Sequence, residues 1–154
     1  MIRGAILLAL CATASAATCT DFDFLAGNWK SVGKEDQATA RTVRMHDGCL
    51  IEEKWHFEKN GKKLFDSLML RSWDANAKRW MLAYADDNGR WQIYEGRHER
   101  GTWSFYRERL DNGKPIVVRI TWTPNPKGYV QTIEKSEDRG LSWKQTERIH
   151  HEPL

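Results

Sequence analysis

Closely spaced turn signals are the feature that most constrains the fold of this chain. Asn-Gly and Asp-x-Gly sequences suit β-hairpins because Asn and Gly tolerate the positive φ angles that tight turns need. These signals occur at Asn60–Gly61, Asp74–Asn76, Asp87–Gly89, Arg100–Gly101, Asp111–Gly113, Pro124–Gly128 and Asp138–Gly140. The runs between them are rich in Trp, Tyr, Phe, Val, Ile and Thr, which favour strands. The pattern predicts an all-β fold, with at most a short helical turn at 21–25.

Short loops join every pair of consecutive predicted strands. The predicted strands are 27–33, 40–46, 49–58, 63–73, 79–85, 90–97, 101–110, 114–123, 127–136 and 142–150. A Greek-key sandwich would need long crossovers, and 34–39 is the only gap that could hold one. An antiparallel up-and-down meander of about 8–10 strands, closed into a β-barrel so that it has no sheet edges, is therefore predicted.

The N-terminus has the pattern of a secretory signal peptide. Arg3 precedes a short apolar run, Ala5–Leu10, and Ala14–Ser15–Ala16 is a small-residue cleavage pattern. The apolar run is too short to span a bilayer as a helix. We therefore expect a signal peptide at 1–16 and a single barrel domain at 17–154, exported to the periplasm or the medium. Leu10 before Cys11 does not fit a lipoprotein, so no membrane anchor is expected after cleavage.

Two cysteines, Cys19 and Cys49, remain after cleavage at this site. In an oxidising compartment they are predicted to form a structural disulfide between the N-terminal arm and an early strand. No Cys-x-x-Cys motif indicates a redox centre.

The charge of the mature chain is balanced. Of 24 basic side chains, the loss of Arg3 leaves 23 against 21 acidic ones, a net charge of +2. This charge is well mixed along the chain, so the sequence does not predict a nucleic-acid or membrane-surface binder. The oligomeric state is left open.

Alternation along the strands predicts which side chains share a face. The predicted groups are Ile51, Glu53, Trp55 and Phe57; Trp80, Leu82 and Tyr84, followed by Trp91 and Ile93; Trp103, Phe105 and Arg107; Val118, Ile120 and Trp122; and Trp143, Gln145, Glu147 and Ile149. A charge on an inward face is costly unless it is paired. Glu53 and Arg107 are therefore expected to pair with each other or with Arg119 or Glu147, or to grip a ligand in a cavity.

Three motifs together resemble lipocalin-like (calycin) barrels, and more narrowly a family of small secreted bacterial proteins of unknown function. These are Phe-Asp-Phe followed by Gly-x-Trp at Phe22–Trp29, Gly48–Cys49 followed by Glu53 and Trp55, and a Ser-x-Asp-x-Gly-x-Ser-Trp turn at Ser136–Trp143. The resemblance implies that Trp29, after Gly27, plugs the closed end of the barrel, and that a basic residue on the last strand, Arg148, covers it.

The turn at Ser136–Trp143 is similar to an Asp-box. Ser136 and Asp138 can bond the turn backbone, Gly140 permits positive φ, and Trp143 can pack beneath the hairpin. We interpret these residues as scaffolding.

Eight tryptophans either fill the core or line a pocket. The leading hypothesis is a barrel that binds an apolar or aromatic small molecule. Its cavity would be lined by Trp55, Trp80, Tyr84, Trp103 and Trp122, and Glu53 and Arg107 would orient the ligand. The alternatives are an enzyme that uses Glu53 as acid or base, and a solid-core structural or interaction module with an exposed aromatic patch.

No motif in the chain calls for a cofactor or a metal ion. The histidines, at positions 46, 56, 98, 150 and 151, form no His-Glu-x-x-His motif. There is also no Gly-x-Ser-x-Gly elbow, phosphate loop or dinucleotide fingerprint. Some calycin-type barrels hold haem through one late histidine, which points to His150 or His151. Because the two are adjacent on a strand, their rings should face opposite sides.

Overall fold

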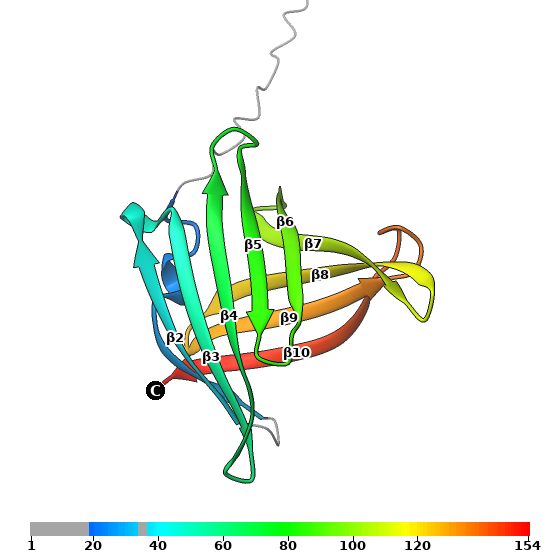
Figure 1. The fold of residues 1–154 in the computed structure, drawn as a ribbon. Coiled ribbons are helices and arrows are strands. Elements are labelled where there is room, and N and C mark those ends of the chain that lie inside the picture. The colour runs from blue at the N-terminus through cyan, green and yellow to red at the C-terminus, as the bar shows by residue number, and fades with distance from the viewer. Residues whose placement is uncertain (1–18, 34–36) are drawn as a thin grey trace, which may run out of the picture.

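The structure, a computed structural model, describes residues 19–33 and 37–154, and in this part of the chain ten antiparallel strands form one closed barrel (Figure 1). The strands are β1 (Gly27–Val32), β2 (Gln37–Met45), β3 (Leu50–Lys59), β4 (Lys62–Asp74), β5 (Arg79–Asp86), β6 (Trp91–Glu99), β7 (Thr102–Asp111), β8 (Lys114–Asn125), β9 (Gly128–Ser136) and β10 (Lys144–Pro153). Two short 3-10 helices are also present: η1 (Asp23–Leu25) precedes β1, and η2 (His46–Gly48) lies between β2 and β3. The signal peptide expected at 1–16 lies outside the described residues.

Every strand pairs with its neighbours in sequence, and β1 also pairs with β10, which closes the wall. The predicted up-and-down meander is therefore confirmed. Turn residues adopt the left-handed backbone that their sequence favours: Asn60 and Gly61 have φ of 53° and 70°, and Asn112 and Gly113 have φ of 51° and 78°.

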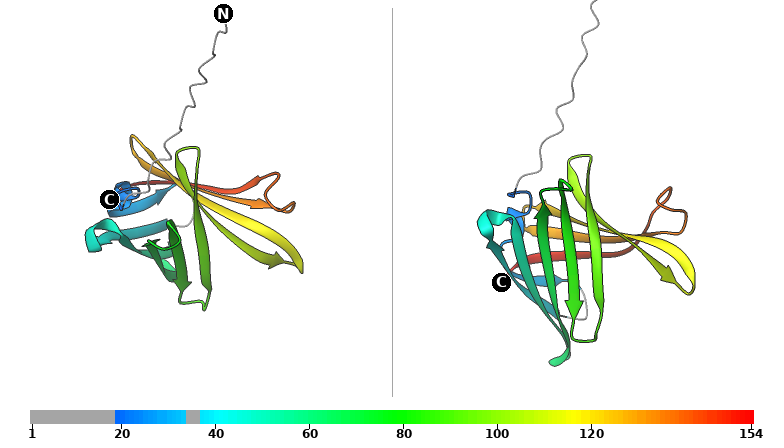
Figure 2. Two further views of the ribbon diagram at one scale, coloured as in Figure 1. Left: turned by 90° about the horizontal axis from the view of Figure 1, so that it is seen from above. Right: turned by 45° about the horizontal axis from the view of Figure 1, so that its top comes forward.

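The barrel wall is only partly paired between β6 and β7. These strands pair only from Glu95–Glu99 to Thr102–Tyr106. Within the described chain, Trp91–Tyr94 of β6 and Arg107–Asp111 of β7 therefore have no partner across this junction, which we call the seam. Figures 1 and 2 show the far ends of β7–β10 extending past the edge of β6.

One end of the barrel is plugged by the N-terminal arm. The Cys19–Cys49 disulfide fixes this arm to the β2–β3 turn, and the predicted pairing is confirmed. Asp21 Oδ2 accepts hydrogen bonds from the indoles of Trp80 (3.2 Å) and Trp103 (2.8 Å). Phe22 packs edge-on against Trp80 at 5.2 Å. This plugged end is the closed end of the barrel.

Trp29 lies at the closed end, where its indole N–H donates to the Leu25 carbonyl at 2.7 Å and its ring meets Tyr129 at 4.9 Å. The expectation that Arg148 covers Trp29 is wrong. Arg148 is exposed on β10 and pairs in register with Thr132, whereas Trp29 pairs with Pro153. Gly128 leaves the space for Trp29, because a Cβ there would lie 3.1 Å from its ring.

Two of the predicted faces are also wrong. Trp91 and Ile93 point outward and are 65% and 44% exposed, since Leu82 and Tyr84 pair with Tyr94 and Gln92 and share their inward face. On β10, a register shift between Gln145 and Glu147 breaks the period of two. Trp143 consequently packs on the outer surface, against Tyr106 at 5.9 Å.

The Ser136–Trp143 turn has the hydrogen bonds expected of its motif. The Ser136 hydroxyl donates to Asp138 Oδ1 (2.6 Å) and accepts from the Gly140 N–H (2.7 Å), while the Ser142 hydroxyl donates to Asp138 Oδ2 (2.5 Å). These bonds hold the pKa of the Asp138 carboxyl at about 2, below its ordinary 3.8. Gly140 has φ of 92°.

Candidate functional site

The half of the barrel away from the plug is hollow. A cavity of about 340 Å³ lies between inward-facing side chains and opens toward the β3–β4 and β5–β6 connections. Its apolar lining includes Trp55, Phe57, Phe65, Met69, Tyr84 and Ile133. Its polar lining comprises Ser31, Arg90, Gln92, Gln131, Glu147 and His151. The cavity is therefore mainly apolar, with a few polar groups.

The structure divides the predicted lining residues between two regions. Trp55 and Tyr84 line the cavity, whereas Trp80, Trp103 and Trp122 are buried in the closed half and do not line it. The reason is the plug: the arm brings Phe22 against Trp80 and an acceptor to two of these indoles. Sequence alternation identifies the inward face of a strand but not the depth of each residue along the barrel axis.

Glu53 lies below the cavity floor in a buried polar cluster. Its side chain is 0% exposed and accepts from the Trp55 indole at 2.6 Å, from Thr42 at 3.4 Å and from Arg71 Nη1 at 3.4 Å. Arg71 is also 0% exposed, and its guanidinium stacks over the Trp122 ring at 4.2 Å. Within the described chain, Arg71 Nε and Nη2 have no hydrogen-bond partner.

The expected partner of Glu53 is therefore corrected. The buried cation is Arg71, not Arg107 or Arg119. Glu53 does not line the cavity, and its carboxylate is surrounded by Trp55, Thr42 and Arg71. A group enclosed in this way cannot reach the proton of a ligand in the cavity, so the geometry gives no support to Glu53 as a catalytic acid or base.

His150 and His151 face opposite sides of β10, as their adjacency predicts: His150 is exposed, and His151 is 3% exposed and forms part of the cavity floor. The His151 ring stacks on Tyr129 at 4.5 Å and tilts against Trp55 at 4.9 Å. Both ring nitrogens are enclosed by protein atoms. Neither nitrogen therefore reaches a space that could hold a haem iron, and the residues do not fit that group.

Arg107 is half-buried at the seam rather than at the bottom of the cavity. Its guanidinium lies 6.0 Å from the centre of the Tyr94 ring. The Tyr94 hydroxyl donates to Gln92 Oε1 at 2.5 Å, and burial raises the pKa of Tyr94. Arg107 is therefore placed beside two residues that line the cavity wall, Gln92 and Tyr94.

The cavity mouth has its own hydrogen-bonded cluster. The Tyr84 hydroxyl donates to Asp86 Oδ2 at 2.7 Å, and Arg90 forms an ion pair with the same carboxylate. Arg90 also lies over the Phe65 ring at 5.1 Å. Burial, followed by the bond to Asp86, raises the pKa of Tyr84. Tyr84 is thus held as a neutral phenol with its ring against the cavity.

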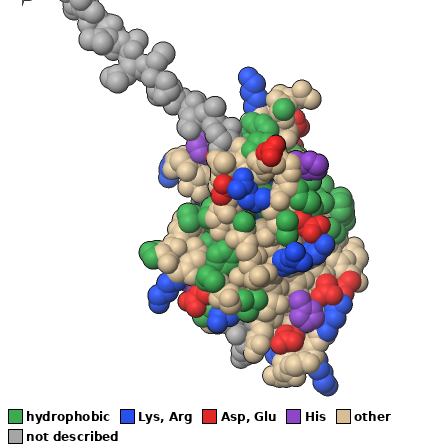
Figure 3. Space-filling view, turned by 90° about the vertical axis from the view of Figure 1, so that its left-hand side faces the viewer, with side chains coloured by type: hydrophobic (Ala, Val, Ile, Leu, Met, Phe, Trp, Pro, Cys, Tyr) green, Lys and Arg blue, Asp and Glu red, His purple; other side chains and the backbone are tan. Residues whose placement is uncertain are grey.

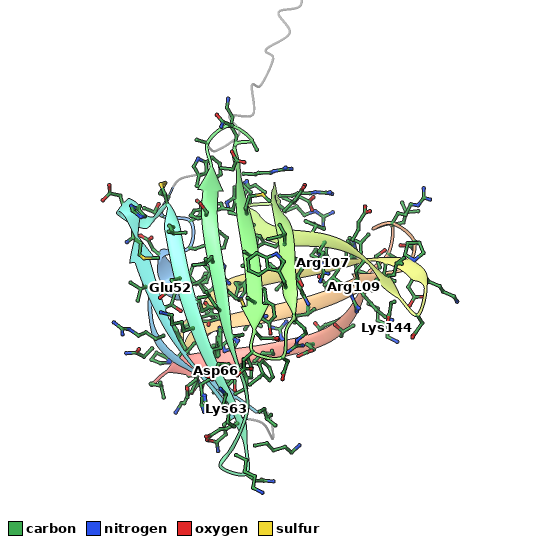
Figure 4. All side chains as sticks on the ribbon, in the orientation of Figure 1. Glu52, Lys63, Asp66, Arg107, Arg109 and Lys144 are labelled. Atoms are coloured by element: carbon green, nitrogen blue, oxygen red, sulfur yellow. A yellow bond between two sulfur atoms is a disulfide. The ribbon has the colours of Figure 1, made fainter. Side chains whose placement is uncertain are left out.

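The outer surface has hollows of its own: one of about 660 Å³ over β2–β5, whose lining includes Lys54, His56 and Asp66, and one of about 670 Å³ with a mainly polar lining that includes Trp91, Arg107 and Arg119. Charged and hydrophobic side chains are interspersed over the face in Figure 3. Lys63 and Asp66, on β4 (Figure 4), form an exposed ion pair at 2.6 Å. Lys63 also pairs with Asp87, just after β5, at 2.8 Å, and His56 Nδ1 of β3 lies 2.7 Å from Asp66 Oδ1, within hydrogen-bond distance. In the described ranges, no three His, Cys, Asp or Glu side chains are grouped to hold a metal ion. No helix among the same residues has the length and apolar character needed to cross a membrane.

The chain matches none of the known protein-family models against which it was compared, and no curated protein matches it.

Proposed function

We propose that this protein is an exported, lipocalin-like barrel that binds an apolar or aromatic small molecule. The observation that carries the proposal is the cavity of about 340 Å³, which is open at one end and lined mainly by aromatic and aliphatic side chains. Small-molecule sites of about 300–1,000 Å³ with a few convergent polar groups are typical of binding proteins.

The contrast between the two halves of the barrel supports this function. The closed half is filled by Phe22, Trp80 and Trp122 and is fixed by a disulfide. The open half keeps Phe57 and Phe65 stacked at 4.3 Å beside an empty volume. A barrel that served only as a solid scaffold would gain stability by filling this volume, because a cavity forgoes packing energy.

Export is supported by two features. The first 16 residues have the charge, apolar run and small-residue pattern of a signal peptide. The Cys19–Cys49 disulfide is typical of proteins in oxidising compartments.

A fluorescence titration with N-phenyl-1-naphthylamine, an uncharged aromatic probe, tests the proposal. The wild-type protein should show saturable binding at micromolar or lower concentrations. Ile133→Trp, which fills the cavity from β9, should weaken binding at least about tenfold, or about 1.4 kcal/mol. Thr132→Trp, which adds the same side chain on the other face of that strand, is the matched control and should bind as the wild type does.

Absence of saturable binding to the wild type, or equal binding by the two variants, would contradict the cavity as the site. Native mass spectrometry of the protein purified from its source provides a second readout. A carried ligand should appear as extra mass that is lost on denaturation.

A partner-binding module is the second candidate, favoured by Trp91 and Ile93, which are exposed on the outer face of β6. Light scattering should then show self-association that Trp91→Ser abolishes, while probe binding in the cavity is unaffected.

A further inference from the structure

We infer that the ligand carries an acidic group, and that Arg107 and Arg109 at the seam recognise it. The ligand class is then an amphipathic anion, with an apolar or aromatic body and a carboxylate or sulfonate. This inference rests on the proposed function and adds the part of the ligand that the apolar cavity does not specify.

The first observation is the position of the two arginines. On β7 they continue the inward face that begins with Trp103 and Phe105, and they pair across β8 with Val118 and Ile116. Beyond Tyr106, however, β7 no longer pairs with β6. Figure 4 shows Arg107 and Arg109 past the edge of β6, so their side chains face the opening in the wall rather than a packed core.

The second observation is that the seam and the cavity are continuous. A second hollow of about 510 Å³ lies at the seam and includes Arg109 in its lining. It shares Arg90, Gln92, Tyr94 and Ile133 with the interior cavity. A ligand body in the cavity can therefore extend between β6 and β9 to reach Arg109, and Arg107 lines a third hollow, of about 670 Å³, that shares Gln92 with the other two.

The third observation is the charge balance. Three other cations near the seam have carboxylate partners: Arg90 pairs with Asp86, Lys135 lies 3.7 Å from Asp111 and 3.1 Å from Glu137, and Arg119 lies 2.7 Å from Glu134. Arg97 of β6 lies over the Tyr106 ring at 4.6 Å. In the described part of the chain, Arg107 and Arg109 make no ion pair.

Asp111 and Glu134 are therefore already held by other cations. Glu147 of β10 borders both hollows, and Glu95, Glu99 and Glu108 line the third hollow beside Arg107. Glu95 is held by Arg79 at 2.8 Å, and Glu99 accepts from the Tyr106 hydroxyl at 2.9 Å. Arginine is suited to this task because its planar fork of donors matches the oxygens of a carboxylate or sulfonate.

Two probes that share one skeleton test the inference. 1-Anilinonaphthalene-8-sulfonate is N-phenyl-1-naphthylamine with one added sulfonate, so the ratio of their dissociation constants isolates the contribution of the charge. In the double variant Arg107→Gln/Arg109→Gln, affinity for the sulfonate probe should fall at least about tenfold, while affinity for the neutral probe should change less than about twofold. Added salt should reduce the wild-type preference for the sulfonate, because it screens exposed charges.

The matched control is Arg41→Gln/Arg148→Gln, which removes the same net charge from exposed, outward-facing positions on β2 and β10. It should leave both affinities unchanged, and melting temperatures should show that both double variants are folded. Equal weakening of the two probes in the seam variant, or no weakening of either, would overturn the inference and leave the cavity proposal intact. Failure of the neutral probe to bind the wild type would instead contradict the proposed function itself.

Discussion

Replacing Glu53 by alanine should destabilise the fold severely. The carboxylate is 0% exposed and lies 3.4 Å from Arg71 Nη1, which is itself 0% exposed. Removing it leaves the guanidinium buried without its counter-charge, and two of the other guanidinium nitrogens already have no partner within the described residues. The Trp55 indole would also lose its acceptor, which lies 2.6 Å away.

The size of the effect follows from the cost of an unpaired buried charge. Removing one partner of a buried ion pair costs about 3–5 kcal/mol. For a domain of this length, about 1 kcal/mol lowers the melting temperature by roughly 3–5 °C, so a decrease of roughly 10–25 °C is expected. Unfolding in guanidinium chloride, monitored by tryptophan fluorescence, would measure the free energy of unfolding.

The control is Glu52→Ala on the same strand. Glu52 lies on the outer face and pairs with Lys54 at 2.8 Å, and a partly exposed pair of this kind is worth less than about 1 kcal/mol. Arg71→Met should be as damaging as Glu53→Ala. The double variant Glu53→Ala/Arg71→Met should lose at least about 2 kcal/mol less than the sum of the two single changes, because no charge remains buried. Additive effects, or a loss below about 1 kcal/mol for Glu53→Ala, would refute the reasoning.

Three further changes test other parts of the fold. Replacing Cys19 and Cys49 by serine should lower the free energy of unfolding by about 3–4 kcal/mol in the chain-entropy model. Added reductant should lower the denaturation midpoint of the wild type but leave that of the serine variant unchanged. Because the pKa of Asp138 is lowered to about 2 from 3.8, the stability that its carboxylate contributes is complete above about pH 4 and is lost as the pH falls toward 2. The melting temperature of Asp138→Asn should therefore fall less than that of the wild type between pH 4 and pH 2. Equal falls would contradict the hydrogen bonds assigned to Asp138. Gly128→Ala should reduce the melting temperature far more than Gly61→Ala. A Cβ at Gly128 would lie 2.1 Å from a β10 carbonyl oxygen, whereas a Cβ at Gly61 would have no atom within 4 Å. Equal effects in a thermal scan would argue against this packing.

The strands and their order could be predicted from the sequence because turn chemistry is local. Asn60–Gly61 and Asn112–Gly113 mark hairpins whatever surrounds them, and short connections between antiparallel strands leave a meander as the simplest topology. The disulfide was predictable for a similar reason, since only two cysteines remain after the expected cleavage site.

Arg71 was not predictable, because its orientation depends on a bulge. With a regular two-residue turn at Asn60–Gly61, Glu53 would pair with Leu68, and the even-numbered residues of β4 would face inward. The register shifts after Phe57, where the extra residue Leu64 is inserted, and Glu53 pairs with Met69 instead. A shift of one residue exchanges the two faces of a strand, so Arg71 enters the core. Because leucines occupy positions 64, 68 and 70, β4 has no clear alternation of apolar and polar residues, and the register shift cannot be recognised from the sequence.

The candidate site could be predicted in kind but not in position. Trp55 and Tyr84 line the cavity, whereas Arg107 lies at a seam that exists only because β6 and β7 separate. Where two strands part depends on the curvature of the whole sheet, which no local pattern of residues encodes.

The position of the chain ends has a practical consequence. Cys19, the first described residue, is joined to the β2–β3 turn at the plugged end, and the backbone N–H of Leu154 bonds to the Asn28 carbonyl at the start of β1, at 3.1 Å. Both ends of the described chain therefore leave the barrel opposite the cavity mouth. A fluorescent reporter, affinity tag or solid support joined to the barrel beside Cys19 or Leu154 would leave that mouth facing the solution, so immobilised protein can be screened against compound libraries without blocking their entry.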